Sequence, residues 1–220
     1  NVGKTLSLGL TAPIAAAGAA AFKLASDMSE SINKVDVAFK DNSTEIKQWS
    51  TTTLNSFGIA KGTALDMAAG FGDMATSMGF TTAGAADMST SLVGLAGDMA
   101  SFKNIGIGEA TTALTAIFTG ETESLKRMGI VMTEANLAAY AMSEGIQTNI
   151  ADMTQAEKVQ LRYNYVMEMT KNAQGDFART SDGAANQMRI FTESLKETGA
   201  ELGSQLLPLI TPMIQKVNEW

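Results

Sequence analysis

The sequence contains no cysteine and no histidine among its 220 residues. These absences exclude disulfide bonds, iron–sulfur clusters and zinc sites built from thiolate or imidazole ligands. They also exclude a cysteine nucleophile and general acid–base catalysis by histidine. A metal site or a hydrolase would therefore have to rest on carboxylates.

Proline is nearly absent as well. The three prolines are Pro13, Pro208 and Pro212, so the 194 residues between the first two contain none. Helix interiors exclude proline more strongly than any other residue, and no run of residues alternates well between apolar and polar. Aromatic residues make up only 6% of the chain, whereas methionine occurs 14 times. The composition predicts an all-α protein.

Clustered positive charge is also missing. The net charge of −7 comes from 16 basic and 23 acidic residues, which are spread evenly over the two halves of the chain. Tight binding to a phosphate backbone needs clustered lysine and arginine. We therefore expect no specific nucleic-acid binding.

The first long helix is expected to begin at Thr11 as N-cap, with Pro13 in its first turn, and to end near Lys40–Asn42. Two i,i+4 ion pairs are predicted on it, Glu30 with Lys34 and Asp36 with Lys40. A second helix, capped by Ser43 or Thr44, should follow. The apolar or small positions of the first helix recur every three or four residues: Ile14, Gly18, Phe22, Ala25, Met28, Ile32, Val35 and Phe39.

Residues 62–102 carry four charges, each an aspartate directly before a methionine. The pattern predicts two helices, at about 63–78 and 82–101, with methionines in the core and aspartates in solvent. A methionine-rich surface for a partner helix or a bilayer is the alternative. The four pairs are Asp66–Met67, Asp73–Met74, Asp87–Met88 and Asp98–Met99.

The second half predicts short helices at 109–118 and 121–128, and another after the cap Thr133 that stops at Gly145. Thr154 and Glu157 form a capping-box sequence for a longer helix. The last helix should start near Ser181 or Asp182 and be kinked or interrupted at Pro208 and Pro212. Its apolar positions approach a heptad seam: Met188, Phe191, Leu195, Thr198, Leu202 and Leu206. Beside the seam, Gly199 and Gly203 would permit a close neighbour.

Breaks near Asn42, Gly79, Gly106, Gly120, Gly145 and Gly175 oppose a single rod, which would reach ~330 Å at 1.5 Å per residue. We therefore expect a compact bundle of about seven to nine helices, with long first and last helices. Residues 1–220 would form one domain, with a possible subdivision into 1–105 and 106–220. Because the chain starts at Asn1 and stops at Trp220 within a helix, it is expected to be a piece of a longer polypeptide.

No catalytic, cofactor-binding or metal-ligating residue is predicted. The glycines at 70, 72 and 79 and at 106 and 108 lack the spacing of phosphate-binding loops. Gly3-Lys4-Thr5 imitates only the end of a P-loop. A hydrolase using acidic residues would need two carboxylates ~5–9 Å apart across a cleft, which the sequence does not indicate. The chain is expected not to be an enzyme.

Two segments resemble the core of tail tape measure proteins of long-tailed phages and prophages. The first is GKTLSLGLTAPIAAAG followed by DMSESINKVDVAF, and the second runs from Thr180 to Trp220. The second segment is similar to a family pattern that closes the globular core. Its matching positions here are Asn186, Gln187, Leu195, Lys196, Gly203, Leu206 and Pro208.

The resemblance implies a structural protein of the virion, located in the tail tube or tail tip after assembly in the host cytoplasm. It implies roles in tail assembly, in tail-length determination and in genome delivery through the host envelope. The implied partners are tail tube proteins, tail-tip or baseplate proteins, tail assembly chaperones, further copies of the chain and, at ejection, the host membrane.

A membrane-active, pore-forming helical module is the alternative function. It is motivated by the weakly charged residues 62–102 and by the stretch Gly9–Leu24, which has no charge before Lys23. That stretch is mostly alanine, which is nearly neutral for bilayer insertion, so a tightly packed helix of small residues is the preferred interpretation.

Overall fold

The computed structural model describes the backbone of residues 2–218, and the side-chain surroundings of residues 17–208, 210 and 211. Within the described residues the chain is 80% helical and contains no strand. The predicted all-α class is therefore confirmed. The run from α1 through α3 is continuous and counts as one helix. When the four-residue α7 is left out, this part of the chain contains nine helices.

The helices follow one another through short turns, in this order: α1 (Val2–Phe39), α2 (Ser43–Trp49), α3 (Thr53–Phe57), α4 (Lys61–Ser77), α5 (Thr82–Phe102), α6 (Ile107–Leu114), α7 (Ala116–Thr119), α8 (Glu123–Arg127), α9 (Glu134–Ser143), α10 (Gln155–Met169), α11 (Asp176–Thr180) and α12 (Ala184–Asn218). Three 3-10 turns lie at Lys40–Asn42, Ser50–Thr52 and Ile150–Asp152.

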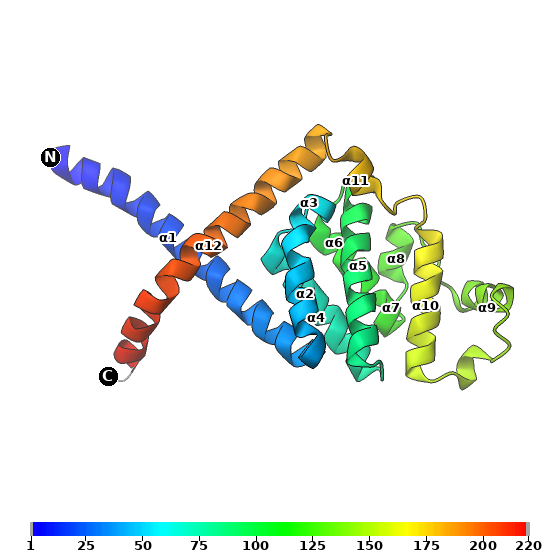
Figure 1. Ribbon diagram of the computed structural model, residues 1–220. Coiled ribbons are helices and arrows are strands. Elements are labelled where there is room, and N and C mark those ends of the chain that lie inside the picture. Colours follow the sequence, from blue (N-terminus) through cyan, green and yellow to red (C-terminus); the bar gives the residue numbers. More distant parts are fainter. Residues whose placement is uncertain (1, 219–220) are drawn as a thin grey trace.

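The molecule consists of a helical body and two long arms (Figure 1). Helices α2 to α11 form the body around α4 and α5, while α1 and α12 cross each other beside it and extend beyond it on the same side. One contiguous cluster of buried residues runs from Val35 in α1 to Ala173 after α10, on both sides of residue 105. The division of the chain at 105/106 stays a prediction.

The centre of the body is built from small residues. Helix α5 is buried without a break from Leu92 to Ala100. Glycine lets other residues approach it closely, because a Cβ added to Gly72 would lie 2.3 Å from the Phe39 ring, and one added to Gly97 would lie 2.8 Å from the Cβ and the carbonyl oxygen of Phe57. Both predicted helices of this region are confirmed, as α4 and α5. The core thus combines small residues and methionine with a few buried phenylalanine rings such as Phe39 and Phe71.

The predicted helix caps are confirmed in the second half. The Thr133 hydroxyl accepts a hydrogen bond from the amide of Asn136 at 3.2 Å. Thr154 and Glu157 form a complete capping box, in which the Glu157 carboxylate accepts from the Thr154 amide at 2.7 Å. Gly145, with φ of 74°, follows the end of α9 as expected. Local polar and glycine signals were sufficient to place these ends.

Both ends of the chain differ from the prediction at proline. Helix α1 begins at Val2, so Thr11 is not its N-cap and Pro13 lies inside it. Helix α12 runs through Pro208 and Pro212 without interruption. The residues around Pro13 include many alanines, the strongest helix formers, which favour continuation of the helix past the lost hydrogen bond.

The two ion pairs predicted along α1 were wrong. Lys34 instead reaches Asp66 on α4, with Nζ 3.0 Å from Oδ1, and Asp36 pairs with Lys47 on α2 at 2.6 Å. Helices packed alongside α1 offer carboxylate and ammonium partners that the spacing within one helix cannot reveal. The pairs consequently tie α1 to the body.

Candidate functional site

The crossing of α1 and α12 is the first of three features that make the arms a candidate functional site. A Cβ added to Gly203 would lie 1.9 Å from the carbonyl oxygen of Ala21 and 2.9 Å from the Cβ of Ala25. One added to Gly199 would lie 2.6 Å from the Leu24 side chain. The predicted close neighbour of these glycines is therefore confirmed, and it is helix α1.

The second feature is the charged face of α12, which points toward the body. Glu197 Oε1 accepts a hydrogen bond from the Lys61 amide at 2.6 Å, and Glu193 Oε2 accepts from the Ala60 amide at 3.3 Å. These amides belong to the first turn of α4, where backbone donors have no partner within the helix and where negative charge is favoured. Two carboxylates one helical turn apart therefore cap another helix. Lys196 pairs with Glu193 at 2.6 Å.

Arg189, one helical turn before Glu193, continues this charged face toward the start of α12. Its Nη2 donates to the carbonyl oxygens of Ala100 at 3.0 Å and Ile105 at 3.1 Å, around the C-terminal end of α5. The guanidinium is half-buried, and burial lowers the pKa of Arg189. The cation supplies the donor for the Ile105 carbonyl and adds a second donor to the Ala100 carbonyl, which also accepts from the Ile105 amide at 3.0 Å.

The third feature is an apolar stripe on the opposite side of α12, which we call the outer seam: Met188, Phe191, Leu195, Thr198 and Leu202. Its four large side chains are 57–63% exposed. Arg189, Glu193 and Glu197 face the body, so α12 reverses the usual arrangement of a helix on a protein surface, whose apolar face is buried. The spacing of these apolar residues was predicted from the sequence, whereas their exposure to solvent is shown by the structure.

A buried polar cluster holds the start of α12 to α5. Asp98, 7% exposed, accepts hydrogen bonds from the amides of Gly175 at 2.7 Å and Phe177 at 3.1 Å. Burial raises the pKa of Asp98, while these two amides oppose the increase. The side chain of Asn186 donates to Ser101 Oγ at 2.8 Å, and that hydroxyl donates to Asp176 at 2.6 Å.

Asp98 is the exception among the four Asp–Met pairs. Asp66, Asp73 and Asp87 are exposed as predicted, and the expectation of a solvated carboxylate was wrong for Asp98 alone. Three of the four methionines are buried and Met74 is partly buried. The core interpretation of this methionine-rich region is therefore confirmed.

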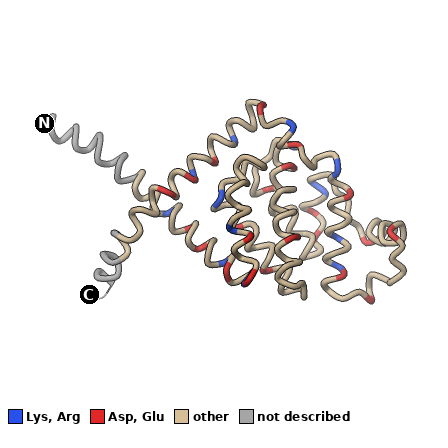
Figure 2. Tube along the Cα trace, in the orientation of Figure 1, with Lys and Arg blue, Asp and Glu red and all other residues tan. Residues whose placement is uncertain are grey.

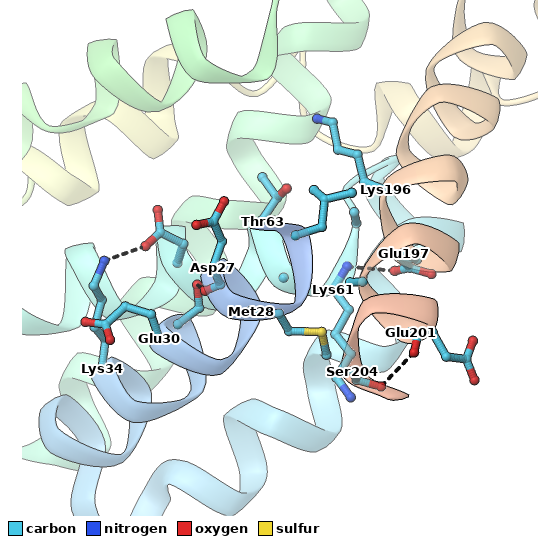
Figure 3. Close-up of a pocket in the computed structure, with 16 residues that line it drawn as sticks. Asp27, Met28, Glu30, Lys34, Lys61, Thr63, Lys196, Glu197, Glu201 and Ser204 are labelled. Atoms are coloured by element: carbon cyan, nitrogen blue, oxygen red, sulfur yellow. Dashed lines mark hydrogen bonds and ion pairs between the residues drawn. The ribbon is translucent and has the colours of Figure 1, made fainter. Parts of the chain in front are cut away.

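An open polar cleft of about 730 Å³ lies where α1, α4 and α12 meet (Figure 3). Lys34 pairs with Asp66, and the amide of Lys61 donates to Glu197. Asp27 is paired with Lys23 at 2.5 Å. The cleft thus presents charges that already stabilise the junction of the arms with the body.

The glycine-rich segments that resemble parts of phosphate loops lie mostly in helices. Gly70 and Gly72 are inside α4, Gly108 is inside α6, and residues 3–5 are inside α1. Within the described residues no group of three or more acidic side chains is arranged to hold a metal ion. The same part of the chain has no helix with the length and apolarity needed to cross a membrane.

The residues that carry the sequence resemblance have identifiable structural roles. Asn186 belongs to the buried polar cluster, Lys196 pairs with Glu193, and Gly203 makes the helix crossing. Leu195 lies exposed in the outer seam. The Gln187 side chain donates to the carbonyl of Ser181 at 2.9 Å and so braces the start of α12.

No family model, curated protein or solved structure matches the chain. The arms therefore define the candidate site through their own geometry. The candidate site is the exposed surface of two crossed helices on a helical body.

Proposed function

We propose that the chain is a structural segment of a tail tape measure protein of a long-tailed phage or prophage. The whole protein would act in tail assembly and tail-length determination, and this segment in assembly. The observation that carries the proposal is the arrangement of α12, whose charged side chains bind the body while its apolar seam faces outward. An exposed apolar stripe of this kind suits contact with another macromolecule more than it suits chemistry in a pocket. The resemblance of residues 180–220 to tape measure proteins supplies the biological setting.

The folded body gives this segment a distinct place in such a protein. A ruler requires an extended chain, whereas α2 to α11 here fold back on one another around a shared core (Figure 1). We infer that the segment contributes a compact module and that the length of the tail is measured by other parts of the polypeptide.

The proposed location is the virion, inside the tail tube or at the tail tip, after assembly in the host cytoplasm. The proposed partners are tube proteins, tip or baseplate proteins and assembly chaperones, with a contribution to genome delivery at the host membrane. Lysine and arginine are interspersed with acidic residues along the described trace (Figure 2). This distribution supports protein partners over a nucleic-acid backbone.

Mass spectrometry of purified tails tests the proposal directly. After prophage induction in the source strain, peptides from residues 17–208 are expected in intact tail particles. An in-frame deletion of the body in the parent gene should abolish tail assembly and should not yield tails shortened in proportion to the deletion. Absence of the peptides from purified tails would refute the proposal, and proportionally shorter tails would refute the non-ruler role.

One of the two observations that motivated the membrane-active alternative is explained by the fold. The weakly charged residues 62–102 form α4 and α5, whose methionine and alanine side chains pack in the core. Dye release from liposomes by the isolated chain at low concentration would revive this alternative.

A further inference from the structure

We propose that the outer seam of α12 binds the same seam of a second copy of this chain, with the two helices antiparallel. The seam extends from Met188 to Leu202, about 21 Å along the helix. This contact follows from the geometry of α12 and does not depend on the proposed role in phage tails.

The outer seam offers a neutral surface through which two acidic copies can meet. The chain has a net charge of −7, so two copies repel each other unless they meet through a neutral surface. On α12 the charges of Arg189, Glu193 and Glu197 are engaged with the body. Between Met188 and Leu202 the seam is flanked on α12 by Thr192, Ser194 and Glu201, and Leu24 of α1 packs over Gly199. No strong charge on the seam selects a partner of opposite sign.

The seam is also complementary to itself in size. A two-fold axis between Lys196 and Glu197 places Phe191 opposite Leu202 of the second copy, and Leu195 opposite Thr198. Each of these pairings occurs twice, as an isologous interface requires. In the same alignment Glu201 lies beside Ser194 of the second copy, so that like charges do not face each other.

The distribution of bulk along α12 favours the antiparallel direction. The N-terminal part of α12 lies against the body, whereas α1 crosses its C-terminal part at Gly203 (Figure 1). An antiparallel pair places the body of each copy beside the part of α12 that follows Gly203 in the other copy. A parallel pair would bring the two bodies together on the same end.

The size of the seam indicates a weak and reversible dimer. A half-exposed side chain of this size presents about 100 Å², so the four large side chains present about 400 Å² on each copy. With their polar rim this approaches the lower limit for a specific interface, near 600 Å² per partner. We expect dissociation in the micromolar range.

A lipid surface is a poorer occupant of the seam. Helices that lie on membranes carry lysine and arginine on their polar face and are attracted to anionic lipids. The polar face of α12 instead holds paired charges that bind the body, on an acidic chain. These features favour the second copy.

Sedimentation velocity of the 220-residue chain over about 5–500 µM brackets the expected affinity. The dimer fraction should rise with concentration, and Leu195→Glu should weaken dimerisation by about tenfold or more because it buries an unpaired charge. Met142→Glu is the matched control, because Met142 is 77% exposed on α9, away from the seam. Both positions are exposed, so neither variant should unfold the chain.

Single introduced cysteines test whether the two α12 helices are antiparallel, since the chain has no cysteine of its own. Thr198→Cys, near the proposed axis, should form a disulfide-linked dimer under mild oxidation. Gln187→Cys should not, because the two thiols would lie about 28 Å apart along the antiparallel pair. Ready cross-linking of Gln187→Cys would overturn the antiparallel arrangement.

Three results would overturn the contact itself. They are a monomer at every concentration, unchanged dimerisation of Leu195→Glu, and binding of the monomer to phosphatidylglycerol vesicles that Phe191→Glu abolishes. Tail incorporation without dimerisation would refute this inference and leave the proposed function intact.

Discussion

Replacing Asp98 by alanine tests how the body holds the last helix. The carboxylate receives the amides of Gly175 at 2.7 Å and Phe177 at 3.1 Å. These amides stand at the start of α11, just before the chain enters α12. Without the carboxylate, both donors remain in a buried site without their acceptor. We therefore expect the connection between α5 and α12 to weaken.

The magnitude follows from the two hydrogen bonds. A hydrogen bond to a charged group contributes about 1.5–3 kcal/mol, so the pair contributes about 3–6 kcal/mol before the cost of burying the carboxylate. That cost is real, because burial raises the pKa of Asp98. We expect Asp98→Ala to lower the free energy of unfolding by about 2–4 kcal/mol, which corresponds to a fall in Tm of about 5–15 °C.

Asp98→Asn keeps the shape and removes the titratable group. It also replaces one of the two accepting oxygens by an NH2 group that cannot accept, so the test of the charge is the change of the stability difference with pH. Below the ordinary aspartate value of 3.8 the carboxyl is protonated in both the folded and the unfolded state. As pH rises from 3.8 through the raised pKa of Asp98, the folded state binds more protons than the unfolded state, so this residue's contribution to stability falls. Urea unfolding of the wild type and of Asp98→Asn from about pH 3 to 8 should therefore show a stability difference that decreases through that window.

Asp87→Asn provides the matched control. Asp87 precedes a methionine on the same helix and is exposed, so its replacement should change the free energy of unfolding by less than about 0.5 kcal/mol. Equal effects of Asp98→Ala and Asp87→Asn on the free energy of unfolding would refute the reasoning. So would a stability difference between wild type and Asp98→Asn that increases with pH in the stated window.

Three further changes test the crossing and the helix ends, each by urea unfolding. Gly203→Ala should lower the free energy of unfolding by about 1–3 kcal/mol, because the new methyl would overlap the Ala21 carbonyl. The control Gly18→Ala meets nothing within 4 Å and should leave this free energy unchanged or raise it by up to about 1 kcal/mol. Equal effects of the two replacements would contradict the close crossing. Thr154→Ala should cost about 1 kcal/mol and Thr154→Ser much less, since serine keeps the capping hydroxyl; an equal loss in both would argue against the capping box. Arg189→Leu should lower the free energy of unfolding by about 1–3 kcal/mol, because the Ile105 carbonyl loses its donor and the Ala100 carbonyl loses one of its two donors; an unchanged midpoint would show that water replaces the guanidinium.

Helix ends with a local signal could be predicted from the sequence. Thr133 and Thr154 carry their own capping chemistry, and Gly145 supplies the positive φ that ends α9. These signals act within a few residues of chain, so they do not depend on the rest of the fold. The short helix α11 lacks such a signal and was missed, because its first turn is ordered by the distant carboxylate of Asp98.

Charged residues were the least predictable part. Lys34 and Asp36 each have a suitable partner four residues away in their own helix, yet both pair with other helices. The four Asp–Met pairs look equivalent in sequence, and only the packing of α11 on α5 distinguishes Asp98 from the rest. Coulombic partners depend on which helices meet, and spacing along one helix does not contain that information.

For α12, apolar spacing was enough to identify the stripe from Met188 to Leu202 and the small residues that admit a neighbour. The spacing leaves open which face of the helix the body covers, because both faces recur with the same period. Glu193 and Glu197 settle that choice by capping α4, and the Gly203 backbone settles it at the crossing with α1. Hydrogen bonds to otherwise unpaired amides and close backbone contact thus turn the apolar stripe outward, where it is available to a partner.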